Sequence, residues 1–323
     1  MMNLANLFHR KPKPTKPAPQ PTPQPEPPKP KALRYVGLNM AGSIQFTGMS
    51  GVKDQVGQVS TGLNKDGTLR LYRYPGGTDA NSFYPLGESA GALQQMVQEA
   101  LDLHADAVIL VGNNTGTFAD DLALIDAFVK AGIYVRAFEV GNEAYLGKYK
   151  IEVADYIAET RDRIANIKKH YPELQCGIAI MPIDGMKDTN NDEAPPKTAE
   201  QQAKLEARLK AKSEDWNGAI LNSGVGDFYV QHFYPDGSEF AEAITVFAGQ
   251  RYNKPVYLTE CNASGTPEQQ AAFYRAFAPV LRTLDWVPVV CWHNGPARGA
   301  KWPVVRITDK GTITPWGQAM IDA

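Results

Sequence analysis

Two glutamates, Glu143 and Glu260, stand out because each one closes a short apolar run. Glu143 ends the run Phe138–Glu143 (FEVGNE), and Glu260 ends the run Pro255–Glu260 (PVYLTE). Two carboxylates held by separate strands can face each other across a sugar, where one protonates the leaving oxygen and the other attacks or stabilises the sugar cation. The pair therefore predicts glycoside chemistry, provided that one fold brings the two side chains together.

Short apolar runs that could form the supporting strands recur along the chain. Several of them show little polar alternation, which is typical of strands buried on both faces. The runs are Tyr35–Asn39, Leu69–Tyr74, Ala107–Val111, Tyr134–Val140, Gly177–Met181, Phe228–Phe233, Val256–Thr259 and Val287–Trp292.

Helical spacing of apolar residues fills most of the intervals between these runs. A capping threonine followed by proline, in Thr266-Pro267, marks one helix start clearly. Only the first connection, Gly42–Gly67, gives a weak helical pattern. The expected helices are Glu88–Leu103, Asp120–Lys130, Val153–Lys169, Ala199–Ala211, Glu239–Gln250 and Pro267–Leu284.

Eight strands alternating with helices predict an α/β chain that forms a (β/α)8 TIM barrel over residues 32–323. A doubly wound open sheet is the rival fold, but it requires a glycine-rich phosphate loop after an early strand. The first run here continues as Gly37–Gly42 (GLNMAG), which lacks that motif. Residues 1–31 are dominated towards their end by proline and lysine, so we expect a disordered proline-rich segment that could tether the barrel to a partner.

The composition of the chain limits which binding partners and which cellular location we expect. The net charge of −2 and the pI near 6.2 provide no basic excess for a nucleic-acid partner. No apolar stretch reaches the roughly 18 residues that membrane insertion requires. The first residues do not resemble a secretory signal, so we expect a cytoplasmic protein or release by a non-Sec route such as lysis or a phage particle. Three scattered cysteines favour neither a disulfide framework nor a zinc site, and we expect no metal and no cofactor.

In a (β/α)8 barrel the functional side chains lie at the carboxyl ends of the strands. Polar and aromatic residues gather at those positions in this sequence. The strand ends are Arg73–Thr78, Gly112–Gly116, Gly141–Glu143, His232–Tyr234, Glu260 and Trp292–Asn294.

This ordered set resembles the clan A retaining glycoside hydrolases, in which Asn-Glu closes the fourth strand and Glu closes the seventh. The runs Arg73–Gly77 (RYPGG) and Phe138–Glu143 look like the arabinofuranosidase and β-xylosidase branches of that clan. The resemblance implies a cofactor-free barrel that acts on a carbohydrate substrate.

The resemblance also implies catalytic roles. Glu143 would be the general acid and then the general base, which must hold a proton long enough to donate it. Glu260 would be the nucleophile and must stay ionised. Arg73 and Tyr234 could supply the charge and the hydrogen bond that keep it so.

Further residues are expected to bind the sugar. Asn142 would bond the 2-hydroxyl, and His232 would contact the acid or the sugar. Asn114 stands in the turn where many clan members carry histidine, and its amide offers a donor and an acceptor. Trp292 would form an apolar platform under the ring, and strand alternation would turn His293 away from the site.

Several alternatives stay open. Glu139 shares the inner face with Glu143, but we expect it to pair with an interior arginine or hydroxyl rather than to act on substrate. A catalytically inactive carbohydrate-binding barrel, tethered to a larger assembly, would carry the same residues, as would a transglycosylase. The sequence leaves the sugar, the linkage, the choice of internal or terminal cleavage and the oligomeric state undetermined.

Overall fold

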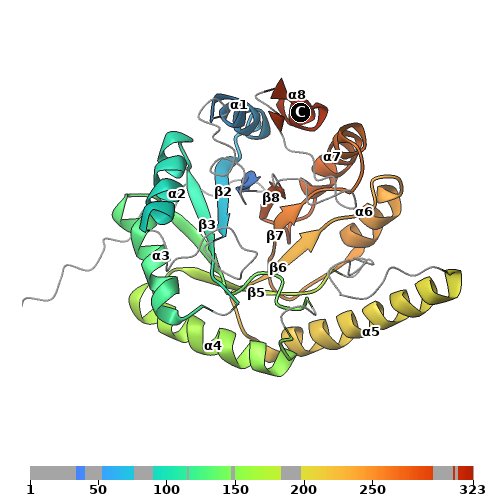
Figure 1. The fold of residues 1–323 in the computed structure, drawn as a ribbon, viewed down its shortest axis with the longest axis horizontal. Coiled ribbons are helices and arrows are strands. Elements are labelled where there is room, and N and C mark those ends of the chain that lie inside the picture. Colours follow the sequence, from blue (N-terminus) through green and yellow to red (C-terminus); the bar gives the residue numbers. More distant parts are fainter. Residues whose placement is uncertain are drawn as a thin grey trace, which may run out of the picture.

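The computed structural model describes residues 34–40, 53–75, 90–114, 116–146, 150–182, 198–293, 308–309 and 312–322. The proline-rich segment 1–31, with its expected role as a tether, lies outside this part of the chain. Strands β1 to β8 form a closed parallel barrel in chain order, with β8 bonded back to β1 (Figure 1). The predicted (β/α)8 barrel is therefore confirmed.

The strands lie close to the predicted runs. At the closure of the barrel, Tyr35 pairs with Leu69 on one side and with Val289 on the other. The bounds are β1 Tyr35–Asn39, β2 Leu69–Pro75, β3 Ala107–Val111, β4 Val135–Glu139, β5 Gln175–Ala179, β6 Phe228–Phe233, β7 Val256–Cys261 and β8 Val289–His293.

Helices surround the barrel as an outer ring (Figure 1). After β8, a small antiparallel pair, β9 Thr308–Asp309 and β10 Thr312–Ile313, leads into the last helix. The helices are α1 Lys53–Leu63, α2 Ala90–Asp102, α3 Phe118–Lys130, α4 Val153–His170, α5 Ala199–Ser223, α6 Phe240–Gly249, α7 Pro267–Leu281 and α8 Pro315–Asp322.

Local sequence signals account for several helix ends. Thr117 and Asp120 form a capping box at the start of α3, and Thr266 and Gln269 form another at the start of α7. Helix α5 ends at Gly224, whose φ of 67° suits a residue without a side chain. These signals fix where each helix begins and ends relative to the strand that it covers.

Two helices differ from the sequence prediction. Helix α1 was only weakly indicated because Gly57 and Gly62 interrupt its apolar period. Gly62 is nevertheless required for packing, since a Cβ there would lie 2.5 Å from the Cα of Ile321 in α8. Helix α5 continues to Ser223, beyond the expected end at Ala211, because its second half regains buried apolar residues such as Ile220.

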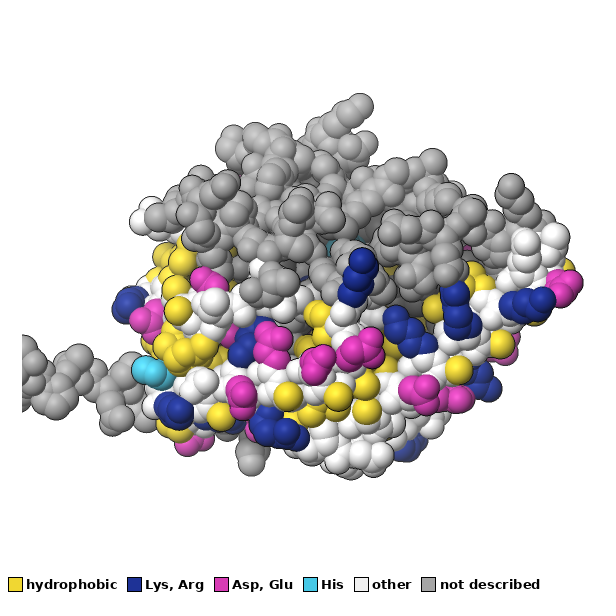
Figure 2. Space-filling view, turned by 60° about the horizontal axis from the view of Figure 1, so that its bottom comes forward, with side chains coloured by type: hydrophobic (Ala, Val, Ile, Leu, Met, Phe, Trp, Pro, Cys, Tyr) yellow, Lys and Arg dark blue, Asp and Glu magenta, His cyan; other side chains and the backbone are white. Residues whose placement is uncertain are grey.

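The outer surface of the described part is mixed in charge. Figure 2 shows the side of the molecule along α4 and α5, where basic and acidic side chains are interspersed. On α5, Lys204 pairs with Glu200 and Lys210 with Glu214, one helical turn apart. No helix among the described residues is both long enough and apolar enough to cross a bilayer.

Candidate active site

Most of the expected site residues converge where the barrel strands end. Arg73 comes from β2, His232 from β6 and Glu260 from β7, while Asn142 and Glu143 follow β4 and Tyr234 follows β6. Direct contacts join them into one cluster, described below. The strand-end rule thus located a set of side chains that do meet in space.

Arg73 is fully buried and donates hydrogen bonds to three other residues of the cluster. Its Nε and Nη2 atoms donate to the two carboxylate oxygens of Glu139, at 2.9 and 2.7 Å. Its Nη1 donates to Glu260 Oε1 at 2.6 Å, and Nη2 also donates to Asn142 Oδ1 at 2.8 Å. Glu139 is therefore the partner of an interior arginine, as expected, and one guanidinium orients both a buried carboxylate and two residues of the site.

Glu260 is surrounded by groups that favour its ionised form. Tyr234 donates its hydroxyl hydrogen to Glu260 Oε2 at 2.6 Å, and burial with the nearby carboxylate keeps the pKa of Tyr234 well above 10. Burial opposes ionisation of Glu260, but His232, Arg73 and His293 together with the Tyr234 bond outweigh it. They hold the pKa of Glu260 well below its ordinary value.

His232 lies between the two glutamates. Its Nδ1 is 2.9 Å from Glu143 Oε1 and 3.7 Å from Glu260 Oε2. Burial lowers the pKa of His232, but the charges of both carboxylates more than compensate, and the net pKa lies above 6.5. The imidazole can therefore share a proton with Glu143 while remaining attracted to Glu260.

The two glutamates are close to each other. One carboxylate oxygen of Glu143, one of Glu260 and a ring nitrogen of His232 all lie within 4.8 Å of one another. Three such ligand atoms could hold a metal ion by distance alone. Arg73, bonded to Glu260 at 2.6 Å, already places a permanent positive charge beside this group, and a second cation would be repelled by it.

The main chain around Glu143 adopts an unusual conformation. Glu143 has a φ of 48° and Gly141 a φ of 82°, both in the left-handed region. A Cβ on Gly141 would lie 2.3 Å from Asn114 Oδ1, so glycine is required there for space as well as for conformation. Such strain at a non-glycine residue is common at functional sites.

The expected role of Asn114 in binding substrate needs revision. Its Nδ2 donates to the carbonyl oxygen of Asn142 at 2.7 Å, and its Oδ1 accepts from the amide of Asn142 at 2.8 Å. Because both ends of the amide face the main chain of Asn142, Asn114 supports the segment that carries Asn142 and Glu143.

The expected sugar platform at Trp292 is wrong. The side chain is 1% exposed and packs outside the barrel, with ring centroids 4.8 Å from Tyr274 of α7 and 5.8 Å from Trp316 of α8. The next residue, His293, points to the site instead, with Nδ1 3.4 Å from Glu260 Oε2. Strand β8 extends to His293, and residues 291 and 293 share its inner face.

Two further residues belong with the site, and one of them, Asn39, was not predicted. Asn39 at the end of β1 is fully buried, and its Nδ2 lies 2.9 Å from His293 Nδ1. The strand-end rule would have found it. Burial and the charges of Glu143 and Glu260 raise the pKa of the Tyr145 phenol well above 10. From the sequence, Tyr145 lies in a strand-to-helix loop, where an outer sugar subsite and simple loop packing are equal alternatives.

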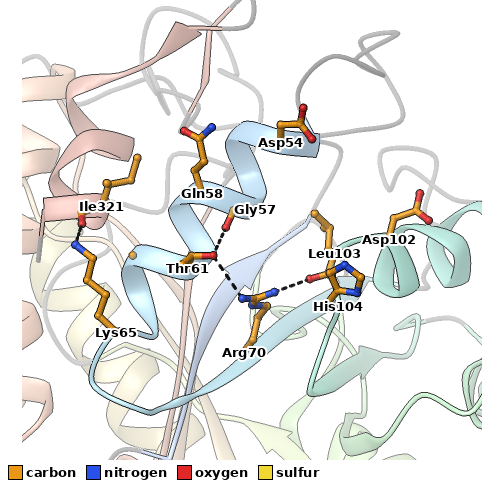
Figure 3. A pocket seen from close by; sticks show the side chains of 11 residues that line it. Asp54, Gly57, Gln58, Thr61, Lys65, Arg70, Asp102, Leu103, His104 and Ile321 are labelled. Atoms are coloured by element: carbon orange, nitrogen blue, oxygen red, sulfur yellow. Dashed lines mark hydrogen bonds between the residues drawn. The ribbon is translucent and has the colours of Figure 1, made fainter.

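A hollow of about 560 Å³ lies at the opposite end of the barrel from the cluster, near the beginnings of β2 and β3 (Figure 3). Its basic groups already bind neighbouring groups of the protein, since Lys65 donates to the carbonyl of Ile321 and Arg70 donates to the carbonyl of Leu103 (Figure 3). The two carboxylates that line it, Asp54 and Asp102, come from different helices, α1 and α2.

Residues 209–320, about a third of the chain, match the family model described as the glycosyl hydrolase catalytic core. No curated protein sequence is significantly similar to the chain. The match and the barrel confirm the expected resemblance to glycoside hydrolases and the expected class of enzyme, a glycosidase.

Solved structures support the fold. An α-L-arabinofuranosidase from Thermotoga maritima, in complex with arabinose, aligns with a TM-score of 0.59 at 15% identity, covering 90% of this chain and 70% of its own. A fungal β-1,4-galactanase aligns at 0.58 and 13% identity, covering 90% and 99%. An exo-β-1,3-glucanase from Aureobasidium namibiae aligns at 0.53 and 11% identity, covering 91% and 97%.

Proposed function

We propose that this glycosidase cleaves O-glycosidic bonds of a plant- or microbe-type polysaccharide or oligosaccharide by double displacement, with retention at the anomeric carbon. The observation that carries the proposal is that one carboxylate oxygen of Glu143 lies within 4.8 Å of one carboxylate oxygen of Glu260. Retaining glycosidases hold their two carboxyl groups about 5–5.5 Å apart, whereas inverting enzymes leave about 6.5–9.5 Å for a water molecule.

In the first step, the ionised Glu260 attacks the anomeric carbon while Glu143 donates its proton to the glycosidic oxygen. The bond from the anomeric carbon to that oxygen breaks, the leaving alcohol departs with the proton, and the sugar is joined to Glu260 as an ester. In the second step, the Glu143 carboxylate takes a proton from water, and the resulting hydroxide oxygen displaces Glu260. The enzyme is then restored and a free sugar is released.

The surrounding residues fit these two roles. Arg73 and Tyr234 each bond one oxygen of Glu260, at 2.6 Å, so the attacking group is both ionised and fixed in orientation. His232 contacts the proposed acid at 2.9 Å and can share its proton. Arg73 has only donors, so the oxygen of the Asn142 amide must face it, and the NH2 group of Asn142 is left as a donor for a sugar 2-hydroxyl.

The sugar itself is proposed only as a class. The solved structures of similar fold bear names that refer to arabinofuranosides, β-1,4-galactan and β-1,3-glucan. A polar pair, Asn39 and His293, stands where the expected aromatic platform of β8 is missing. We therefore expect a sugar that presents hydroxyl groups, rather than an apolar face, towards β1 and β8.

The test is a panel of aryl glycosides that includes α-L-arabinofuranosides, β-D-xylosides, β-D-glucosides, β-D-galactosides and β-D-mannosides. We expect turnover of at least one of them, and ¹H NMR of the first product should show the anomer of the substrate. Glu260→Ala should be folded and inactive. An inverted first product would refute the mechanism. Sugar binding without turnover by any member of the panel would favour the inactive binding barrel instead.

A further inference from the structure

The segment that follows β4, residues 140–146, needs external support for its shape. It contains two residues in the left-handed region, Gly141 and Glu143. A glutamate adopts this conformation only where the surroundings fix it. The placement of the Glu143 carboxylate therefore depends on whatever holds this main chain.

Support comes from three elements outside β4. Tyr156 of α4 donates its hydroxyl hydrogen to the carbonyl of Val140 at 2.8 Å. Lys212 of α5 donates to the carbonyl of Tyr145 at 2.6 Å. Between these two points, the side-chain amide of Asn114 accepts a hydrogen bond from the N–H of Asn142 and donates one to its carbonyl. Of these three main-chain supports, Asn114 is the one nearest to Glu143 along the chain.

The turn that carries Asn114 is itself held in place by a buried ion pair. Arg163 of α4 donates through Nε and Nη2 to the two oxygens of Asp121 of α3, at 2.7 and 2.6 Å. Its remaining nitrogen, Nη1, donates to the carbonyl of Asn113 at 2.8 Å. Both charged side chains are nearly inaccessible, with Arg163 6% and Asp121 1% exposed.

The turn packs directly against this pair. A Cβ on Gly112 would lie 2.5 Å from Arg163 Nη2 and 2.7 Å from Asp121 Oδ1. The space between the ion pair and the end of β3 is therefore too small for even one methyl group. A displacement of the guanidinium must move the turn, and with it the amide of Asn114.

A buried ion pair adds little net stability compared with an apolar pair of the same volume, so stability alone does not account for the pair at this place. We infer that the Asp121–Arg163 pair is a positioning device for the general acid, acting on Glu143 through Asn113, Asn114 and the main chain of Asn142. The inference rests on the proposed function. Neither charged residue touches the reacting atoms, and both act through the segment that they fix.

The experiment compares two leaving groups on the sugar that the wild type hydrolyses fastest. A phenyl glycoside needs the proton from Glu143, whereas a 2,4-dinitrophenyl glycoside releases a stable anion without it. Arg163→Lys keeps the charge but cannot bond three acceptors in one plane. We expect kcat/KM, which reports the first chemical step, to fall roughly 10- to 100-fold for the phenyl glycoside. For the dinitrophenyl glycoside we expect less than a roughly threefold change.

A second variant guards against a general loss of folding. The double replacement Arg163→Met with Asp121→Leu removes both charges and fills the same space, so its urea midpoint should stay near that of the wild type. It should show the same selective loss on the phenyl glycoside. Wild-type activity of this folded variant on the phenyl substrate, or an equal fall on both substrates, would overturn the inference.

Asn217→Ala is the matched control. Asn217 of α5 makes the same two main-chain bonds as Asn114, but to Met181 after β5, at 2.8 and 2.9 Å. Asn114→Ala should lose activity selectively on the phenyl glycoside, and Asn217→Ala should not. Glu143→Ala separates the two levels of the argument. If it lacks the leaving-group dependence, the proposed function fails; if it has the dependence and Arg163→Lys lacks it, only the positioning role fails.

Discussion

Removal of Arg73 is the most demanding test of the buried cluster. The side chain makes four hydrogen bonds, and two of its acceptors, Glu139 and Glu260, are carboxylates that are themselves buried. Arg73→Met would leave both without their permanent cation. Breaking a buried ion pair by deleting one partner costs about 3–5 kcal/mol. Because two carboxylates lose their partner here, we expect a loss near the upper end of that range, a large part of the roughly 5–15 kcal/mol that stabilises a typical domain.

The double variant Arg73→Met with Glu139→Leu separates stability from function. It removes the deeper carboxylate together with the cation, so most of the lost stability should return, to within about 2 kcal/mol of the wild type. Activity should not return. Burial already acts to raise the pKa of Glu260, and without Arg73 the nucleophile loses its bond at Oε1 and one of the charges that keep it ionised.

Urea denaturation followed by tryptophan fluorescence measures the first effect, and kcat/KM on the best aryl glycoside from pH 4 to 9 measures the second. We expect the single variant to be strongly destabilised, the double variant to be nearly restored, and both to be inactive at neutral pH. A single variant with the wild-type urea midpoint would show that the cluster is not the ionised assembly described above. A restored fold with full activity would show that Arg73 does not serve the nucleophile.

Three further predictions concern single positions. Glu260→Ala should reduce kcat by roughly 10⁴- to 10⁶-fold, as loss of a nucleophile does elsewhere, while its urea midpoint stays measurable; near-normal turnover would exclude Glu260 as nucleophile. Gly141→Ala should lower stability by about 1–3 kcal/mol because its φ is 82° and its Cβ would meet Asn114; activity on phenyl glycosides should fall with it, and an unchanged enzyme would contradict the described loop. The raised pKa of His232 means that its stabilising contribution is complete below pH 6.5 and is lost as the pH rises through the higher folded-state value. The stability difference between wild type and His232→Gln should therefore shrink between pH 6.5 and 9, and a difference independent of pH would refute the shift.

The barrel could be predicted from the sequence because its signals are local and repeated. Parallel strands buried on both faces read as continuous apolar runs, and the runs at Tyr35–Asn39, Ala107–Val111 and Phe228–Phe233 coincide with β1, β3 and β6. The strand-end rule then selected Glu143 and Glu260 without any knowledge of their separation. Helix α1 was the element that the sequence predicted least clearly, because its stability comes from close packing on α8 at Gly62 rather than from its own apolar period.

The supports of the site could not be predicted in the same way. Arg163 and Asp121 lie on neighbouring helices, 42 positions apart, and read as ordinary surface charges of amphipathic helices. Their role depends on a close approach at Gly112, which a sequence shows only as one more glycine in a loop. Asn114 was selected as a polar residue at a strand end, but its partner is the main chain of Asn142. A hydrogen bond from a side chain to the main chain of a segment distant in the sequence leaves no trace in the pattern of side chains.

Trp292 and His293 point in the directions opposite to those predicted, and the error has a general cause. Side chains of a strand alternate between the two faces, so the inner positions of β8 are fixed by any one residue known to point inwards. His293 supplies that reference, because its Nδ1 lies 3.4 Å from Glu260 Oε2. Trp292 must then face outwards, towards Tyr274 and Trp316 in the helical layer. An aromatic residue at a strand end thus identifies a sugar platform only after it is known which residues of the strand point into the barrel. By that criterion β8 supplies a histidine beside Glu260, and its tryptophan packs against α7 and α8.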